Sequence, residues 1–96
     1  MISAQRKVLR RPVMQRIVNE LGYAGRGKEA AQYAELMTIV FPDAISFEQA
    51  GDEWAGAGDV ERARRDYLKA LRLEPNRAGL GDKLSRLGAT SKKETR

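Results

Sequence analysis

Residues 44–77 constrain the fold most strongly, because they contain two apolar patterns of helical period separated by a single turn signal. In each half, apolar or small residues recur at intervals of three and four, which is the spacing of one face of an α-helix. The recurring positions are Phe47, Ala50, Gly51 and Trp54, followed by Val60, Ala63, Tyr67, Ala70 and Leu71. Gly58 can take the left-handed conformation that ends a helix, and Asp59 can accept hydrogen bonds from the free N–H groups that begin the next. Because Pro75 cannot continue a helix, the segment predicts a hairpin of two helices that spans 34 residues.

The order of small, aromatic and proline residues in this hairpin resembles the tetratricopeptide repeat, a helix–turn–helix unit of about 34 residues. The positions that carry the resemblance are Ala50, Gly51, Trp54, Gly58, Asp59, Ala63, Tyr67, Ala70 and Pro75. Small residues allow two helices to approach closely, while Trp54 and Tyr67 fill the wider gaps, so we interpret both aromatic residues as core rather than as a stacking site. The resemblance implies an all-α fold in which antiparallel helix–turn–helix repeats wind into a right-handed superhelix.

Residues 11–43 carry a weaker copy of the same pattern. The corresponding pairs are Leu21 and Trp54, Gly25 and Gly58, Ala30 and Ala63, and Pro42 and Pro75. The departures are Arg26 in place of the turn aspartate, Ala34 at the position of Tyr67, and Met37 at the position of Ala70. We expect one helix over residues 12–22 and a second over residues 28–41. Their expected apolar positions are Val13, Ile17, Val18 and Leu21, then Ala30, Tyr33, Ala34, Leu36, Met37, Val40 and Phe41.

Further helices are expected on both sides of the two repeats. Residues 2–11 predict a short leading helix, and residues 77–88 predict a capping helix. The cap has Leu80, Leu84 and Leu87 on its apolar side, Arg77, Lys83 and Arg86 facing outward, and Gly88 as its stop. Solenoid repeats bury their faces only against neighbours, so this cap would cover the open side of the preceding helix. We therefore expect about five helices in one domain over residues 1–88, and a disordered tail over residues 89–96.

The composition excludes several classes of chemistry. The chain has no cysteine and no histidine, so a disulfide framework, a zinc site and a Cys–His or Ser–His nucleophile pair are all excluded. We expect no enzymatic activity, no cofactor and no metal site. No apolar run approaches the ~20 residues that span a bilayer. Because the opening MISAQRKVLRRP carries charges where a secretory signal needs its apolar core, we expect a cytoplasmic protein.

The net charge of +5 is divided into three blocks. Residues 1–28 carry seven basic residues and one acidic residue, while residues 29–59 carry seven acidic residues and no basic one. Residues 60–96 carry eleven basic and five acidic residues. A basic chain suggests acidic partners such as nucleic acid. The alternation of sign equally indicates charge pairing, either within the fold or between copies of the chain.

The resemblance also implies a concave groove lined by the first helix of each pair. The side chains expected on it are Gln15, Asn19, Glu48, Gln49, Asp52, Asp82 and Arg86. Related modules that capture peptide C-termini use basic and amide side chains there, whereas Glu48 and Asp52 would repel a terminal carboxylate. We therefore expect a bacterial interaction or assembly adaptor whose guest is a basic or amphipathic peptide or a partner helix. The alternative is that Glu48, Asp52 and Glu53 form only the solvated face of an amphipathic helix.

Three further alternatives remain open. In self-assembly, the acidic middle of one copy would meet a basic end of another. Nucleic acid binding would use the basic runs at 6–11 and 62–72, although the second run alternates with buried positions of its own helix and is explained by a solvated face. Finally, the motifs FPDA, GD, Y..AL.L.P and KLSRLG resemble C-terminal repeats of some bacterial hydrolases and serine-beta-lactamase-like proteins. That resemblance implies an accessory module without catalytic residues.

Overall fold

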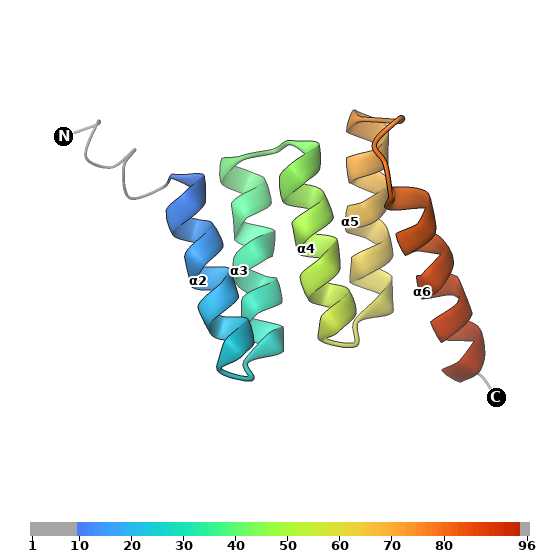
Figure 1. Cartoon of the computed structure of the whole chain (residues 1–96), viewed down its shortest axis with the longest axis horizontal. Helices are drawn as coiled ribbons and strands as arrows, with labels where there is room; N and C mark the ends of the chain where they lie inside the picture. Colours follow the sequence, from blue (N-terminus) through green and yellow to red (C-terminus); the bar gives the residue numbers. More distant parts are fainter. Residues whose placement is uncertain (1–9, 95–96) are drawn as a thin grey trace.

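The computed structural model describes the backbone of residues 10–94 and the side chains of residues 10–88. This part of the chain consists of five α-helices: α2 (Arg11–Tyr23), α3 (Gly27–Val40), α4 (Ala44–Gly56), α5 (Val60–Leu73) and α6 (Leu80–Glu94). Each helix packs against the next in sequence, and successive helices run in opposite directions (Figure 1). No strand occurs among residues 10–94. The expected all-α fold is confirmed, while the leading helix expected over residues 2–11 lies almost wholly outside the described residues.

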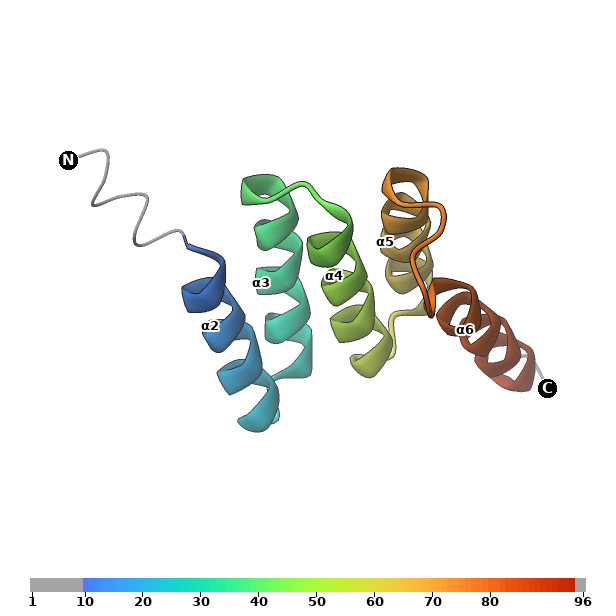
Figure 2. The ribbon, with the colours of Figure 1, turned by 45° about the horizontal axis from the view of Figure 1, so that its top comes forward.

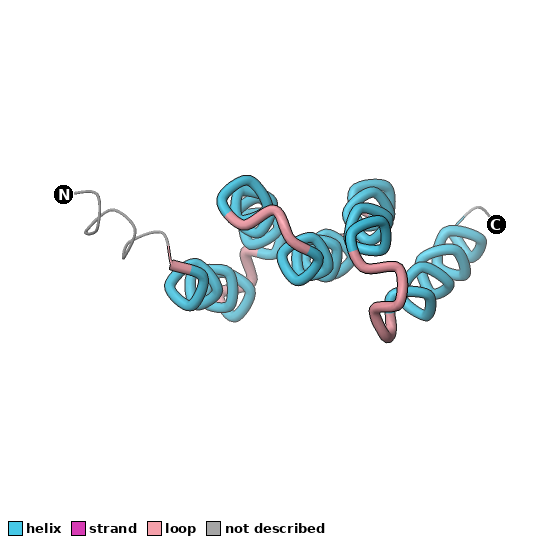
Figure 3. The backbone as a smooth tube through the Cα atoms, turned by 90° about the horizontal axis from the view of Figure 1, so that it is seen from above, coloured by secondary structure: helices cyan, strands magenta, loops and turns pink. Residues whose placement is uncertain are grey.

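The helices form two layers. Seen from above, α2, α4 and α6 lie in one layer, and α3 and α5 lie in the other (Figure 3). The stack is long and flat, with extents of 54 × 32 × 16 Å. A tilted view shows the helices following one another from α2 at one end to α6 at the other (Figure 2). The layer of α2, α4 and α6 contains the first helix of each expected pair.

The turns within the two helix pairs share one backbone geometry. Gly25 and Gly58 have φ angles of 77° and 86°, in the left-handed region that glycine adopts without steric cost. Asp59 caps α5, because its carboxylate accepts a hydrogen bond from a backbone N–H in the first turn of that helix at 3.0 Å. Arg26 occupies the equivalent position before α3 but provides no cap, and its guanidinium pairs with Glu29 instead. Arginine in place of aspartate at residue 26 therefore removes the side-chain cap but leaves the glycine turn unchanged.

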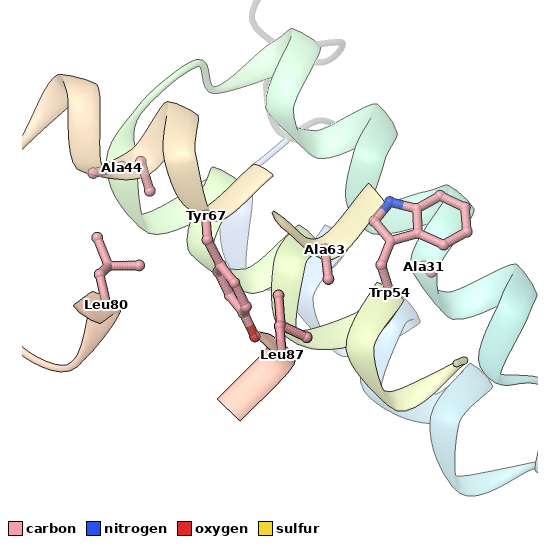
Figure 4. Close-up of a cluster of buried hydrophobic side chains, with 8 residues drawn as sticks. Ala31, Ala44, Trp54, Ala63, Tyr67, Leu80 and Leu87 are labelled. Atoms are coloured by element: carbon pink, nitrogen blue, oxygen red, sulfur yellow. The ribbon is translucent and has the colours of Figure 1, made fainter. Parts of the chain in front are cut away.

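The core lies between the two layers. Trp54 and Tyr67 are only 5% and 3% exposed, so the interpretation of both as core residues is confirmed. Figure 4 shows their cluster, to which α6 contributes Leu80 and Leu87. A second cluster joins α2, α3 and α4 and consists of Met14, Val18, Ala30, Ala34, Met37 and Ala50.

Val13, expected on the apolar stripe of its helix, and Leu36, expected beside such a stripe, are both exposed. Val13 and Leu36 are 44% and 46% exposed, and Met14, at 1%, takes the buried place on α2. With Pro12 in the first turn of α2, the face toward α3 runs through Met14 and Val18, one residue away from the expected start. The prediction for Val13 was therefore wrong, although the helix itself was predicted correctly.

The last helix differs from the expected cap at both ends. It begins at Leu80 rather than Arg77, because Gly79 has a φ of 88°, which is outside the helical region. It then continues past Gly88 to Glu94, through most of the segment expected to be disordered. A glycine inside a helix costs only about 1 kcal/mol relative to alanine, so Gly88 is not sufficient to end the helix. The late start leaves Arg77 in the loop between α5 and α6.

Candidate functional site

The seven expected groove residues all lie on the layer of α2, α4 and α6. Their positions are Gln15 and Asn19 on α2, Glu48, Gln49 and Asp52 on α4, and Asp82 and Arg86 on α6. The α4 residues follow the spacing of one helix face, and Ile45, one turn earlier, extends this stripe. Ile45 is 49% exposed, so the polar stripe of α4 begins with one accessible apolar side chain.

Glu48 lies at the centre of this surface and is paired within the chain. Its carboxylate accepts hydrogen bonds from Nε of Arg77 and Nζ of Lys83, each at 2.6 Å. Burial would by itself raise the pKa of the Glu48 carboxyl, but the bonds from Lys83 and Arg77 outweigh burial and hold this pKa below its ordinary value. The expected acidic centre thus contains two cations of its own. These cations tie α6 and the loop before it to α4.

Asp52 shares one of these cations. Its Oδ1 accepts a hydrogen bond from the Tyr67 hydroxyl at 2.7 Å, and Nζ of Lys83 donates to its Oδ2 at 3.1 Å. Burial would lower the pKa of Lys83, but its bonds to Glu48 and Asp52 raise that pKa above the ordinary value. Burial and the bond to Asp52 also raise the pKa of the Tyr67 hydroxyl. Lys83 therefore bridges two carboxylates, and the network as a whole is close to charge balance.

A hollow of about 350 Å³ opens beside this network, between α4, α5 and α6. In Figure 1, α6 leans away from α5 toward the C-terminal end of α6. The lining of the hollow consists of Asp52, Ala55, Gly58, Val60, Tyr67, Lys83, Arg86 and Leu87. Arg86 is exposed, so the lining combines apolar side chains with the Asp52–Lys83 ion pair and one accessible positive charge.

The section between α2 and α4 is less charged. On α2, Nε2 of Gln15 lies 3.4 Å from Oδ1 of Asn19, and Gln49 on α4 is half-buried. Arg11, at the start of α2, donates a hydrogen bond to the Ser46 hydroxyl at 2.8 Å and pairs with the N-cap carboxylate of α4. These contacts fix the beginnings of α2 and α4 side by side. The polar side chains in this section are mainly uncharged amides, not charged groups of a single sign.

The acidic block of residues 29–59 pairs largely within the fold. Six of its seven carboxylates form ion pairs with described residues: Glu29 with Arg26, Glu35 with Arg65, Asp43 with Arg11, Glu48 with Arg77 and Lys83, Asp52 with Lys83, and Asp59 with Arg62. Burial and the charge of Asp52 raise the pKa of the seventh, Glu53. Charge pairing within the fold therefore accounts for most of the acidic block.

Three groups of the site were not expected from the sequence. Arg77 and Lys83 were expected to face outward, and the hydroxyl of Tyr67 was given no role. Arg77 and Lys83 bond to Glu48, 29 and 35 residues earlier, so no local spacing connects them to it. The only signal in the sequence was the opposite charge of residues 29–59 and residues 60–96. It indicates that ion pairs form between these segments but does not identify the partners.

Comparisons with known proteins add no family assignment. A scan against models of protein families and a search of curated proteins both give no match. Within residues 10–94, no helix combines the length and apolarity that crossing a membrane requires. No group of three or more carboxylates suited to a metal ion comes together in the same part of the chain. The described chain is therefore identified by its architecture, as an all-α domain of five helices packed in sequence.

Proposed function

We propose that the chain is a tetratricopeptide-like interaction module, not an enzyme, and that it binds a polypeptide along the surface of α2, α4 and α6. The observation that carries this proposal is the arrangement of these three helices in one layer (Figure 3). Their small and aromatic residues contribute to the core, while a stripe of polar side chains remains accessible. A surface of this kind suits an extended peptide or an amphipathic helix.

The charges on this surface favour an amphipathic guest over a strongly basic one. Glu48 and Asp52 already pair with Arg77 and Lys83. A basic guest would have to displace these cations, and little net attraction is left at the centre to offset that loss. The expected attraction for cationic peptides is therefore weak in this section.

The section between α2 and α4 offers hydrogen bonds instead. The amides of Gln15, Asn19 and Gln49 can each donate and accept, which matches the groups of a peptide backbone. Ile45 adds an apolar contact, because it is 49% exposed at the start of the α4 stripe. We place the centre of the interface on these four side chains.

The ion pairs weaken two alternatives. Self-assembly through the acidic middle has few free acids to use, since six of the seven are paired within the chain. On α5, Arg62, Arg65 and Lys69 each contact an acidic or aromatic side chain of the chain itself, which leaves fewer free cations for phosphates. An accessory role beside a catalytic domain is compatible with this proposal.

The test starts from a displayed library of amphipathic peptides selected on the wild-type chain. The affinity of an enriched peptide is then measured by fluorescence anisotropy for Gln49→Arg and Asn19→Arg. We expect each substitution to weaken binding by about tenfold or more, because a long charged side chain would occupy the interface.

Gln32→Arg is the matched control. Gln32 is exposed on α3, in the opposite layer, and the same chemical change there should leave the affinity within about twofold. If Gln32→Arg weakens binding as strongly as Gln49→Arg, or if neither α2 nor α4 variant has an effect, the proposed surface is wrong.

A further inference from the structure

Asp66 on α5 is buried without hydrogen-bond donors. It is 0% exposed, and neither carboxyl oxygen accepts a hydrogen bond from a described residue. Nε of Arg65 lies 3.5 Å from Oδ1, which is too long for a good hydrogen bond. A buried carboxylate in such surroundings strongly destabilises a fold unless it keeps its proton.

Glu35 on α3 shares the Arg65 guanidinium with Asp66 and is better supplied with hydrogen-bond donors. Its Oε1 accepts hydrogen bonds from Nε1 of Trp54 and from an Nη of Arg65, each at 2.9 Å. Burial would raise the pKa of Glu35, but bonds from Asp66 and Trp54 and the charges of Arg65 and Lys69 outweigh burial and lower it. Glu35 therefore keeps its negative charge while Asp66 keeps a proton.

The charged groups around this pair come from the helices packed against it. Glu35 belongs to α3, Arg65 and Lys69 belong to α5, and the contact from α4 is the uncharged indole of Trp54. Burial, the hydrogen bond with Glu35 and the charge of Glu35 raise the pKa of Asp66 to about 7, and Arg65 offsets only part of this rise. The two carboxyl groups thus share a single proton near neutral pH.

We propose that Glu35 and Asp66 form a proton-dependent latch that joins α3 to α5. These helices belong to different helix pairs, and each packs more extensively against α4 than against the other. While Asp66 is protonated, its O–H donates to Glu35 and holds the two pairs together. When Asp66 loses the proton, two carboxylates face each other without a second donor, and the repulsion releases α3 from α5. The stack is closed at mildly acidic pH and loosens as the pH rises through neutrality.

The composition makes the titration of Asp66 easy to distinguish from that of other side chains. The chain has no histidine, so no side chain has an ordinary pKa between about 5 and 8. The folded chain retains a proton that the unfolded chain releases near pH 4. The stabilisation by the latch is therefore present at low pH and is lost as the pH rises from about 4 through about 7. Carboxyls with a lowered pKa, such as Glu48, are ionised in both states above about pH 5 and add no slope there.

The test is urea unfolding from pH 5 to pH 8.5, followed by the fluorescence of Trp54, the one tryptophan in the chain. For the wild type, the unfolding constant should rise about 50-fold between pH 5 and pH 7. Asp66→Asn carries a permanent N–H donor and should remove most of this rise. Glu35→Gln keeps an acceptor for Trp54 but removes the opposing charge, so it should move the rise to lower pH. Glu61→Gln, the same chemical change at an exposed acid on α5, is the matched control and should leave the rise in place.

A second measurement needs no variant, and it covers the case in which Asp66→Asn fails to fold. Carboxyl ¹³C resonances of the folded wild-type chain should include one that titrates near pH 7. The proposal is overturned if every carboxyl titrates below about pH 5. It is equally overturned if the wild-type unfolding constant stays within about threefold over the range, or if a folded Asp66→Asn variant keeps the full rise.

Discussion

The aromatic ring of Tyr67 on α5 lies directly against Gly51 on α4. A Cβ atom added to residue 51 would be 2.5 Å from both Cδ1 and Cε1 of that ring. The ring has little room to move, because Tyr67 is 3% exposed and its hydroxyl is bonded to Asp52. The absence of a side chain at residue 51 is therefore what allows α4 and α5 to nest at this point.

Gly51→Ala should destabilise the chain in spite of the better helix propensity of alanine. Overpacking of a close contact typically costs about 1–3 kcal/mol, and propensity returns up to about 1 kcal/mol of that. We expect a net loss of about 1–2 kcal/mol in the free energy of unfolding, measured by urea denaturation.

Gly56→Ala tests the same chemical change on the same helix without the contact. No atom lies within 4 Å of a Cβ placed at residue 56. We expect this variant to be unchanged or stabilised by up to about 1 kcal/mol. Equal stabilities for the Gly51 and Gly56 variants would show that the Tyr67 contact does not limit the approach of α4 and α5.

Tyr67→Phe should cost about 1–2 kcal/mol, because Asp52 loses one donor while the ring remains in place. The raised pKa of Tyr67 also has an alkaline consequence. The folded chain keeps the phenolic proton at a pH where the unfolded chain releases it, so this contribution is lost as the pH rises above about 10. The wild type should therefore lose unfolding free energy above pH 10 more steeply than Tyr67→Phe, as measured by urea denaturation. Parallel curves for the two proteins would contradict the assignment.

Removing the charge of Glu48 should loosen the docking of α6. Glu48→Gln removes the negative charge that Arg77 and Lys83 share and replaces one acceptor oxygen by an NH₂ group, and the side chain of Glu48 is only 15% exposed. We expect a loss of about 1–3 kcal/mol, between the values for exposed and buried pairs. A double-mutant cycle with Lys83→Met should give a coupling of about 0.5–1.5 kcal/mol that shrinks in high salt. Additive effects would mean that the bridge is not energetically coupled.

The exposed Arg26–Glu29 pair provides the comparison for that cycle. Both side chains are about half exposed and lie three residues apart in the same turn region. Exposed pairs of this kind contribute little, so Glu29→Gln should have no measurable effect on urea denaturation. A large loss of stability in Glu29→Gln would mean that solvent exposure does not explain the difference between this pair and the ion pairs of Glu48.

Acid should unfold the chain through the carboxyls whose pKa is lowered. Burial of Asp43 opposes ionisation, but its bonds to Ser46 and Arg11 outweigh burial and lower its pKa, and Glu48 is lowered by Lys83 and Arg77. Stability from these groups is present above the unfolded pKa of about 4 and is lost as the pH falls through their folded values. Together with the latch, this predicts a stability maximum near pH 5 in urea denaturation. Asp43→Asn and Glu48→Gln should each flatten the acidic limb, and an unchanged limb in both variants would exclude these two groups as its source.

Much of the fold follows from local patterns in the sequence. Gly25 and Gly58 were expected in the turns, and Trp54 and Tyr67 were expected in the core, because each of these roles depends on residue type and helical spacing. The start of α6 did not follow, since Gly79 sits just before Leu80 and shifts the helix away from the repeat register.

The contacts of the candidate site were less predictable, because they join helices that are far apart in sequence. Glu48 was expected on the surface of α4, but its bonds to Arg77 and Lys83 depend on where α6 docks. The burial of Asp66 is the clearest feature that the sequence reading did not predict. Asp66 lies three residues after Ala63 and four before Ala70, on the buried stripe of α5, and an acid at such a position is itself a signal of a buried polar contact.

Backbone amide chemical-shift mapping with a selected peptide will show whether the layer of α2, α4 and α6 is the binding surface. We expect the largest shifts on Gln15, Asn19, Gln49 and their neighbours in that layer. Leu36 on α3 and Leu68 on α5, both exposed in the opposite layer, should be unaffected. Shifts concentrated around Leu36 and Leu68, with none along α2 and α4, would contradict the proposed binding surface.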